Sequence, residues 1–346
     1  MEFMTPIDIK PLPEPISYRD RILLTGSCFT EHIGQSLTDH KFTVLQNPHG
    51  ILFDPASVCK SLISYVQQKE YTREDLFLLN EVWHSWDHHS RFSHIDPQAA
   101  LDAINASQRA AHQFLKEASW IIITLGSSYS YRLTAQAQGR PSADGALLHG
   151  SFAPGVANCH RAPAQWFTKH LLEIEETITL LDNCYHQLMH FNPKLRILFT
   201  ISPVRHLRDG VVDNNRSKAR LIEAVHHMVH KFERLHYFPA YELVMDVLRD
   251  YRFYDVDMAH PNYQATGFVM EHFAGSCIDP PTRGVMEDVR KLVIARRHRA
   301  FQPATQAHQQ FLNNHYEKTR QLQAQHPYLN LQEELDYFAA TPTHDK

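Results

Sequence analysis

Short apolar runs alternate with longer stretches of helical spacing over most of this chain, and this alternation constrains the fold more than any single motif. Each apolar run has the length of one strand and is rich in aliphatic residues: 21–25, 120–125, 196–201 and 241–246. The main stretches of helical spacing follow these runs: 29–39, 164–189, 218–234 and 262–273. Parallel strands need crossover connections, which are usually helices. The alternation therefore predicts an α/β fold with a mostly parallel sheet and helices on both faces.

Two further regions lie outside this simple alternation. Residues from about 55 to 118 favour helices, and we interpret them as a helical insertion. The pair Pro280-Pro281 predicts a boundary between a main domain, 1–280, and a C-terminal helical extension, 281–346. The extension is charged, and it either packs on the main domain or forms a homo-oligomer interface.

Composition excludes several classes of partner. The formal net charge is −4 and there is no long basic run, so we expect no nucleic-acid binding. No stretch approaches the roughly 18 apolar residues that cross a bilayer, and the first residues carry no secretory signal pattern. The five cysteines are irregularly spaced and form no C-x-x-C pair, which is typical of reduced thiols. We therefore expect a cytoplasmic protein without membrane partners.

The residues that follow the first apolar run could supply a nucleophile. Gly26, Ser27 and Cys28 lie between a predicted strand and a predicted helix. A helix N-terminus offers free backbone N–H groups that stabilise negative charge. We favour Ser27 as the nucleophile, with the thiol of Cys28 as the alternative. The simpler interpretation is that Ser27 only caps the helix.

A carboxylate and a histidine lie close together near the end of the main domain. Asp257 and His260 are three residues apart, and Pro261 follows directly. A loop of this spacing can fold the carboxylate onto the imidazole, which would orient His260 as general base for Ser27. The alternative is an ordinary surface loop in which Asp257 caps the next helix.

The stretch 23–30 reads Leu-Leu-Thr-Gly-Ser-Cys-Phe-Thr and resembles the signature of the GSCFA family, with Thr30 where the family name has Ala. Six further stretches also resemble that family: 47–52, 90–93, 123–126, 156–160, 202–206 and 257–261. A serine in the first block, with aspartate and histidine in the last, resembles the SGNH (GDSL-like) hydrolases. Together the matches cover about residues 20 to 275.

The resemblance implies a three-layer α/β/α sandwich of the SGNH hydrolase type, with Ser27 as nucleophile and Asp257 and His260 as its partners. It also implies an oxyanion hole in which the Ser27 N–H is one donor and Gly50 is the second. Related hydrolases use an Asn as third donor where this chain has Ser128. Either Ser128 takes that role, or Asn158 supplies an amide from another loop.

Four residues are candidates for substrate contact. Trp86 lies in an irregular aromatic patch, 83–94, whose rings could stack on sugar faces, and His160 is either a pocket residue or structural. Arg205 and His206 follow the third apolar run, where they would hold an anionic group or pair with neighbouring aspartates.

The patch also contains His84, His88, His89 and His94, but zinc needs three or four converging ligands. We expect no metal and no other cofactor. The sequence thus predicts a serine esterase that hydrolyses an O-acyl ester, on a carbohydrate or a related small molecule. The alternatives are an O-acyltransferase using the same site, or a non-catalytic carbohydrate-binding module that retains the fold.

Overall fold

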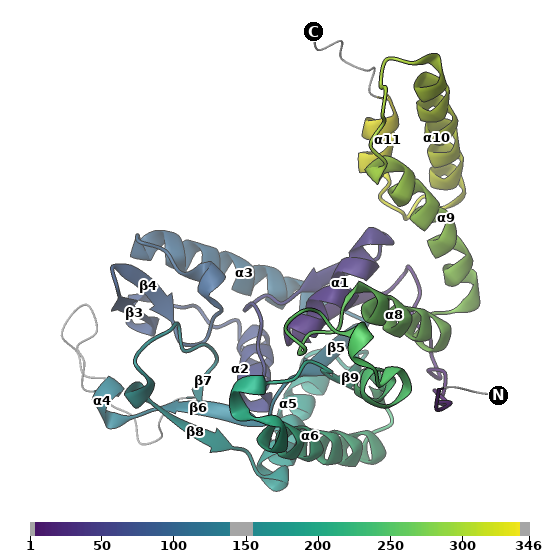
Figure 1. Ribbon diagram of the computed structural model, residues 1–346. Helices are drawn as coiled ribbons and strands as arrows, with labels where there is room; N and C mark the ends of the chain where they lie inside the picture. The colour runs from purple at the N-terminus through teal and green to yellow at the C-terminus, as the bar shows by residue number, and fades with distance from the viewer. Residues whose placement is uncertain (1–3, 139–154, 340–346) are drawn as a thin grey trace.

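The protein is built on one sheet of five parallel strands. The computed structural model describes residues 4–138 and 155–339 (Figure 1). The strand order is β10-β9-β5-β1-β2, and every neighbouring pair is parallel. The strands are β1 (Arg21–Gly26), β2 (Thr43–Gln46), β5 (Trp120–Leu125), β9 (Arg196–Ile201) and β10 (Leu235–Tyr237).

Helices and two small antiparallel sheets complete the described part. The helices are α1 (Cys28–Asp39), α2 (Pro55–Val66), α3 (Pro97–Glu117), α4 (Ala135–Gln138), α5 (Ile174–Phe191), α6 (Val211–Lys231), α7 (Ala240–Glu242), α8 (Tyr263–Cys277), α9 (Pro280–Arg297), α10 (Gln306–Gln325) and α11 (Gln332–Ala339). The first small sheet pairs β3 (Leu76–Leu79) with β4 (Val82–Ser85), and the second has the order β7 (Gly155–Val156), β6 (Tyr129–Leu133), β8 (Phe167–Leu171).

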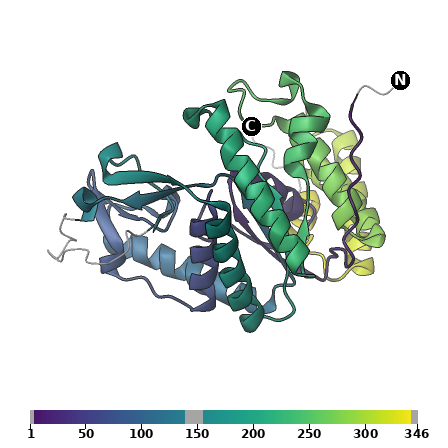
Figure 2. The same cartoon turned by 90° about the horizontal axis from the view of Figure 1, so that it is seen from below.

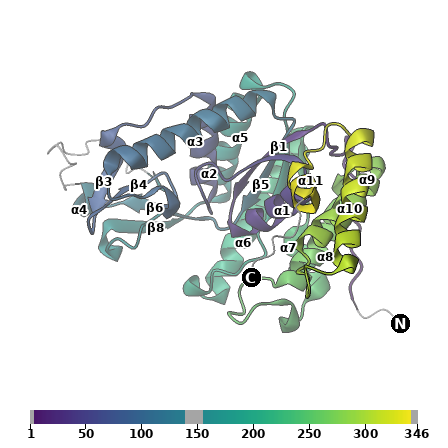
Figure 3. The same cartoon turned by 90° about the horizontal axis from the view of Figure 1, so that it is seen from above.

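The central strands are buried on both faces, which explains their continuous apolar runs. One face, with Leu23 and Ile121, packs against α2, α5 and α6, whereas the other face, with Leu24 and Ile122, packs against α1 and α8. Figure 3 shows these two helical layers with the sheet between them, and Figure 2 shows them from the opposite side. The fold is the three-layer α/β/α sandwich that the resemblance implied.

The C-terminal helices form the expected helical extension and dock on the main domain. Helix α9 contributes Met286 and Val289 to the same apolar core as strand β1. The carboxylate of Glu334 in α11 is fully buried between Lys41, at 2.9 Å, and Arg296, at 3.0 Å. Because Lys41 belongs to the turn after α1, this ion-pair cluster joins the extension to the sandwich. In residues 4–138 and 155–339, no helix combines the length and the apolarity needed to cross a membrane.

Two elements expected from the sequence are different in the structure. Residues 241–246 are not a strand, because they lie in α7 and a π-helical turn, Leu243–Leu248, whose apolar side chains are buried against the sheet. The last strand of the sheet is instead β10. The long helix expected over 164–189 begins at Ile174, because the preceding residues form β8 and a short 3-10 turn.

The region 55–118 contains α2, the hairpin β3–β4 and α3. Helix α2 packs on α5 in a core layer beside the sheet, and the hairpin β3–β4 lies between α2 and α3. Pro280 and Pro281 are the first residues of α9. The chain turns just before them, at Ile278 and Asp279.

Candidate functional site

The turn after β1 places Ser27 at the carboxyl edge of the sheet. Gly26 has a φ of +139°, and a Cβ there would lie 2.1 Å from the carbonyl oxygen of Thr124, so only glycine fits. Ser27 is 1% exposed, and its side chain makes no capping hydrogen bond to α1. Its Oγ has no hydrogen-bond partner among the described residues. The capping interpretation therefore does not account for Ser27.

The loop before α8 holds Asp257 and His260 together. Asp257 Oδ2 lies 2.6 Å from His260 Nδ1, as the spacing predicts. The other carboxylate oxygen accepts hydrogen bonds from the N–H groups of Ala259, at 2.9 Å, and His260, at 3.0 Å. These backbone bonds lower the pKa of Asp257 to about 2. The carboxylate therefore stays ionised at neutral pH and can orient the imidazole.

Backbone contacts bring this loop to the same edge as the nucleophile turn. The N–H of Arg205, after β9, donates to the carbonyl of Ala259, at 3.3 Å. Gly126, after β5, lies against Ser27, since a Cβ added at Gly126 would be 3.2 Å from the Ser27 Cβ. The loops after three parallel strands thus meet where sites form in open α/β sheets. Ser27 and His260 make no hydrogen bond in this structure.

A buried lysine joins the ends of β5 and β9. Lys218 of α6 is 1% exposed, and its Nζ donates to the carbonyls of Gly126 and Ser202, both at 2.6 Å. Burial lowers its pKa to about 7, and no ion pair with a carboxylate is found for it within the described ranges. The burial of Lys218 was not predicted, because a single lysine inside a helical stretch carries no sign of burial in the sequence.

Three of the four expected oxyanion donors already have acceptors. The N–H of Ser27 donates to the Thr124 carbonyl, at 3.0 Å, and the N–H of Gly50 donates to the Asn47 carbonyl, at 2.7 Å. The hydroxyl of Ser128 donates to the Ser217 carbonyl, at 2.8 Å. None of these three groups is free to bind an oxyanion in this structure.

Asn158 and Asn47 offer amide groups in different places. The Oδ1 of Asn158 accepts the N–H of His160, at 2.8 Å, inside its own turn. Asn47 is fully buried, and its Oδ1 accepts the N–H of Gly26, at 3.0 Å, one residue before Ser27. The Nδ2 of Asn47 has no partner in the described part of the chain. Asn47 lies in the stretch 47–52 that resembles the family, in which Gly50 was the residue expected to act as oxyanion donor.

Trp86 and His160, two of the candidates for substrate contact, are both packed against other residues of the protein. Trp86 stacks on Phe77 with ring centroids 3.5 Å apart and planes 10° apart. His160 is buried, and its Nε2 lies 2.8 Å from the Ser85 carbonyl. Burial lowers the pKa of His160 to about 4. One face of Trp86 is therefore unavailable for a sugar, and His160 acts as a neutral packing residue here.

Arg205 and His206 lie at the edge of the candidate site. The guanidinium of Arg205 lies 4.7 Å from the ring centre of Tyr254 and makes no ion pair with a carboxylate in the described segments. The nearby aspartates pair elsewhere, Asp209 with Lys169 and Asp213 with Arg216. Arg205 thus remains available for an anionic group.

The ring of His206 is held edge-on to Phe53, with centroids 5.5 Å apart. Burial, followed by the charge of Lys218, lowers the pKa of His206 to about 4. This imidazole is therefore neutral at pH 7, and it lines the site without adding charge.

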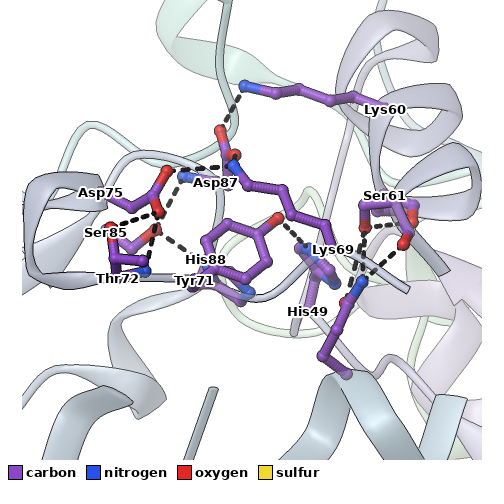
Figure 4. A network of polar contacts seen from close by, with 12 residues as sticks. His49, Lys60, Ser61, Lys69, Tyr71, Thr72, Asp75, Ser85, Asp87 and His88 are labelled. Carbon is purple, nitrogen blue, oxygen red and sulfur yellow. Dashed lines mark hydrogen bonds and ion pairs between the residues drawn. The ribbon is translucent and has the colours of Figure 1, made fainter. Parts of the chain in front are cut away.

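A second polar cluster surrounds His49, the residue before Gly50 in the chain (Figure 4). His49 Nδ1 is 2.7 Å from the hydroxyl of Tyr65, and its Nε2 is 3.2 Å from the hydroxyl of Tyr71. His88 stacks on His49 with centroids 4.0 Å apart. A cavity of about 120 Å³ beside them is also lined by Lys60. Burial lowers the pKa of His49 to about 3. No sequence pattern indicated this cluster.

The histidines of the patch 83–94 bind neighbouring polar groups. His84 Nδ1 is 2.7 Å from the hydroxyl of Ser93, and His88 Nδ1 is 2.9 Å from that of Ser85. In residues 4–138 and 155–339, no group of three or more histidine, cysteine or carboxylate side chains is arranged to hold a metal ion.

Comparison with known proteins agrees with the motifs. The GSCFA family matches residues 21–273, and the C-terminal domain of GSCFA domain proteins matches residues 289–341. No curated protein matches the chain. The first match covers most of the chain and contains both the turn at Gly26 and the loop from Asp257 to His260. The chain therefore belongs to the GSCFA family.

Proposed function

We propose that this protein hydrolyses an O-acyl ester on a carbohydrate or a related small molecule. The observation that supports this most strongly is the 2.6 Å contact between Asp257 Oδ2 and His260 Nδ1 at the carboxyl edge of the sheet. That contact leaves His260 Nε2 to accept a proton from a nucleophile. The turn at Gly26, which begins at the same edge, supplies two adjacent nucleophiles, Ser27 and Cys28.

The proposed reaction has two half-reactions. The nucleophile attacks the acyl carbon while His260 takes its proton, and His260 then protonates the leaving alcohol. Water, activated by His260 in the same way, releases the acid from the acyl-enzyme. The free guanidinium of Arg205 beside the loop favours substrates that carry a negative charge near the ester.

The first experiment measures steady-state hydrolysis of p-nitrophenyl acetate and of a peracetylated monosaccharide. His260→Ala should lower kcat/KM by at least about 10³-fold, because the general base is lost. His227→Ala is the matched control, since His227 is exposed on α6. Adding a free sugar as acceptor distinguishes hydrolysis from acyl transfer by the products.

Two results would contradict this proposal. Equal rates for the protein and for His260→Ala would show that the hydrolysis does not use this base. No turnover of either ester, together with no acyl-enzyme in the intact mass, would favour a non-catalytic binding module.

A further inference from the structure

Ser27 and Cys28 are neighbours in the chain, but the turn encloses only the first of them. The N–H of Ser27 donates to Thr124, and its carbonyl accepts the N–H of Thr30, at 2.9 Å. The Ser27 Cβ faces Gly126, where even a methyl group would not fit easily. With 1% of its surface exposed, Ser27 offers a substrate almost no access.

Cys28 is the first residue of α1, a helix of 12 residues, and its side chain is partly exposed. Burial raises the pKa of the Cys28 thiol, and the backbone N–H groups of Phe29 and Cys28 oppose this rise. They belong to the N–H groups that the first turn of a helix leaves without a carbonyl partner. The positive end of the helix thus lies at the sulfur, where it can stabilise a thiolate and later an oxyanion.

A second observation is independent of the helix. The ammonium of Lys218 is completely buried and bonds only to backbone carbonyls, those of Gly126 and Ser202. A buried charge without a counter-ion is costly. Burial raises the pKa of the Cys28 thiol, and the charge of Lys218 is the largest effect that opposes this rise. Lys218 is therefore a buried positive charge that favours the thiolate form of Cys28 against the effect of burial.

We propose that Cys28, rather than Ser27, is the nucleophile of the ester hydrolysis proposed above, and that Lys218 and the N-terminus of α1 stabilise its thiolate. This inference rests on the proposed function. Lys218 acts as a positioning residue, because it holds the ends of β5 and β9 and acts on substrate only through Cys28.

The chemistry balances without any further reactant. The Cys28 thiol transfers its proton to Nε2 of His260, and the sulfur forms a bond to the acyl carbon. The alkoxide leaves and takes that proton, so the products are the alcohol and a thioester. Water then loses a proton to His260 and attacks the thioester, which releases the carboxylic acid, and the proton returns to the sulfur.

The first test compares turnover of p-nitrophenyl acetate by three variants. Cys28→Ala should lower kcat by at least about 10³-fold, because the nucleophile is gone. Cys28→Ser keeps the size of the side chain and should also lose most of the rate, since a serine hydroxyl is not ionised near neutral pH. Ser27→Ala should stay within about tenfold, because a group that does not touch the transition state does not stabilise it.

The second test does not need enzymatic activity. Iodoacetamide at low concentration, followed by peptide mapping, compares Cys28 with Cys159, the other partly exposed cysteine. Burial raises the pKa of Cys159 to about 11, and no cation opposes that shift. Cys28 should be alkylated faster, and Lys218→Met should remove most of that advantage while urea unfolding confirms that the variant is folded.

The outcomes separate this inference from the proposed function. If Ser27→Ala abolishes turnover and Cys28→Ala does not, Ser27 is the nucleophile, and the inference is overturned while the esterase proposal stands. If Cys28 reacts no faster than Cys159, the stabilised thiolate is overturned. If no form of the protein turns over or becomes acylated, the proposed function itself fails.

Discussion

Two histidine regions of this protein differ in their exposure to solvent. At the carboxyl edge of the sheet, the side chains of His260 and Asp257 are 43% and 51% exposed. In the second cluster, His49 and His88 are almost completely buried and stack on each other. Both regions contain histidines with well-placed hydrogen-bond partners, so hydrogen bonding alone does not distinguish them.

The electrostatic surroundings do distinguish them. His260 has an ionised carboxylate on Nδ1, which stabilises an imidazolium. His49 has two neutral hydroxyls as partners, and burial together with the charges of Lys60 and Lys69 lowers its pKa to about 3. A solvent-exposed histidine with a carboxylate partner can serve as a general base, whereas a buried histidine with neutral partners suits packing. This difference supports the proposal that proton transfer takes place at the edge and that the buried cluster is structural.

The largest expected effect concerns the carboxylate at the edge. Asp257→Asn keeps the shape of the loop but removes the charge that stabilises the imidazolium, so kcat for ester hydrolysis should fall by about 10²- to 10⁴-fold. The free energy of unfolding should change little, because the pair is solvent-exposed. Steady-state kinetics and urea unfolding of the same preparation measure both. A large loss of stability with unchanged kcat would reverse the roles assigned to the two regions.

A smaller effect is expected on the pH dependence of stability, through the buried histidine His49. The pKa of His49 is about 3 in the folded protein and about 6.5 in an unfolded chain. The unfolded state therefore binds more protons between these values, and stability falls as the pH decreases from about 6.5 towards 3. For His49 alone the slope approaches about 1.4 kcal/mol per pH unit. Urea unfolding at a series of pH values from 7 to 4.5 measures it.

The variant His49→Phe is the control for that slope. It should lower stability at pH 7 by about 1–3 kcal/mol, because the hydroxyls of Tyr65 and Tyr71 lose a buried partner. The remaining pH dependence should be flatter, since one histidine no longer resists protonation. Other buried histidines, such as His160 and His206, would still contribute. An unchanged slope would show that His49 does not carry the acid sensitivity.

The strands at the centre of the sheet were predictable, and the elements at its margin were not. β1, β5 and β9 are buried on both faces, so each reads as a continuous apolar run. β2 is a short edge strand with half-exposed side chains, and its sequence carries no such run. Residues 241–246 have strand-like composition but lie in helical turns, since short apolar runs do not distinguish the two states.

In the candidate site, local geometry was predictable and long-range contacts were not. The spacing of Asp257 and His260 was enough to predict that their side chains meet. The hydrogen bond from the Ser27 N–H to the Thr124 carbonyl depends on the pairing of β1 with β5, which are far apart in the chain. The burial of Lys218 likewise depends on how α6 packs, and no local pattern shows it.

The most direct measurement is rapid mixing of the protein with p-nitrophenyl acetate, followed by absorbance and intact mass. The account predicts a burst of p-nitrophenolate that approaches one equivalent per chain, an acetyl adduct on the turn at Gly26, and neither with His260→Ala. A linear time course without an adduct, identical in the protein and in His260→Ala, would contradict the assignment of catalysis to this edge of the sheet.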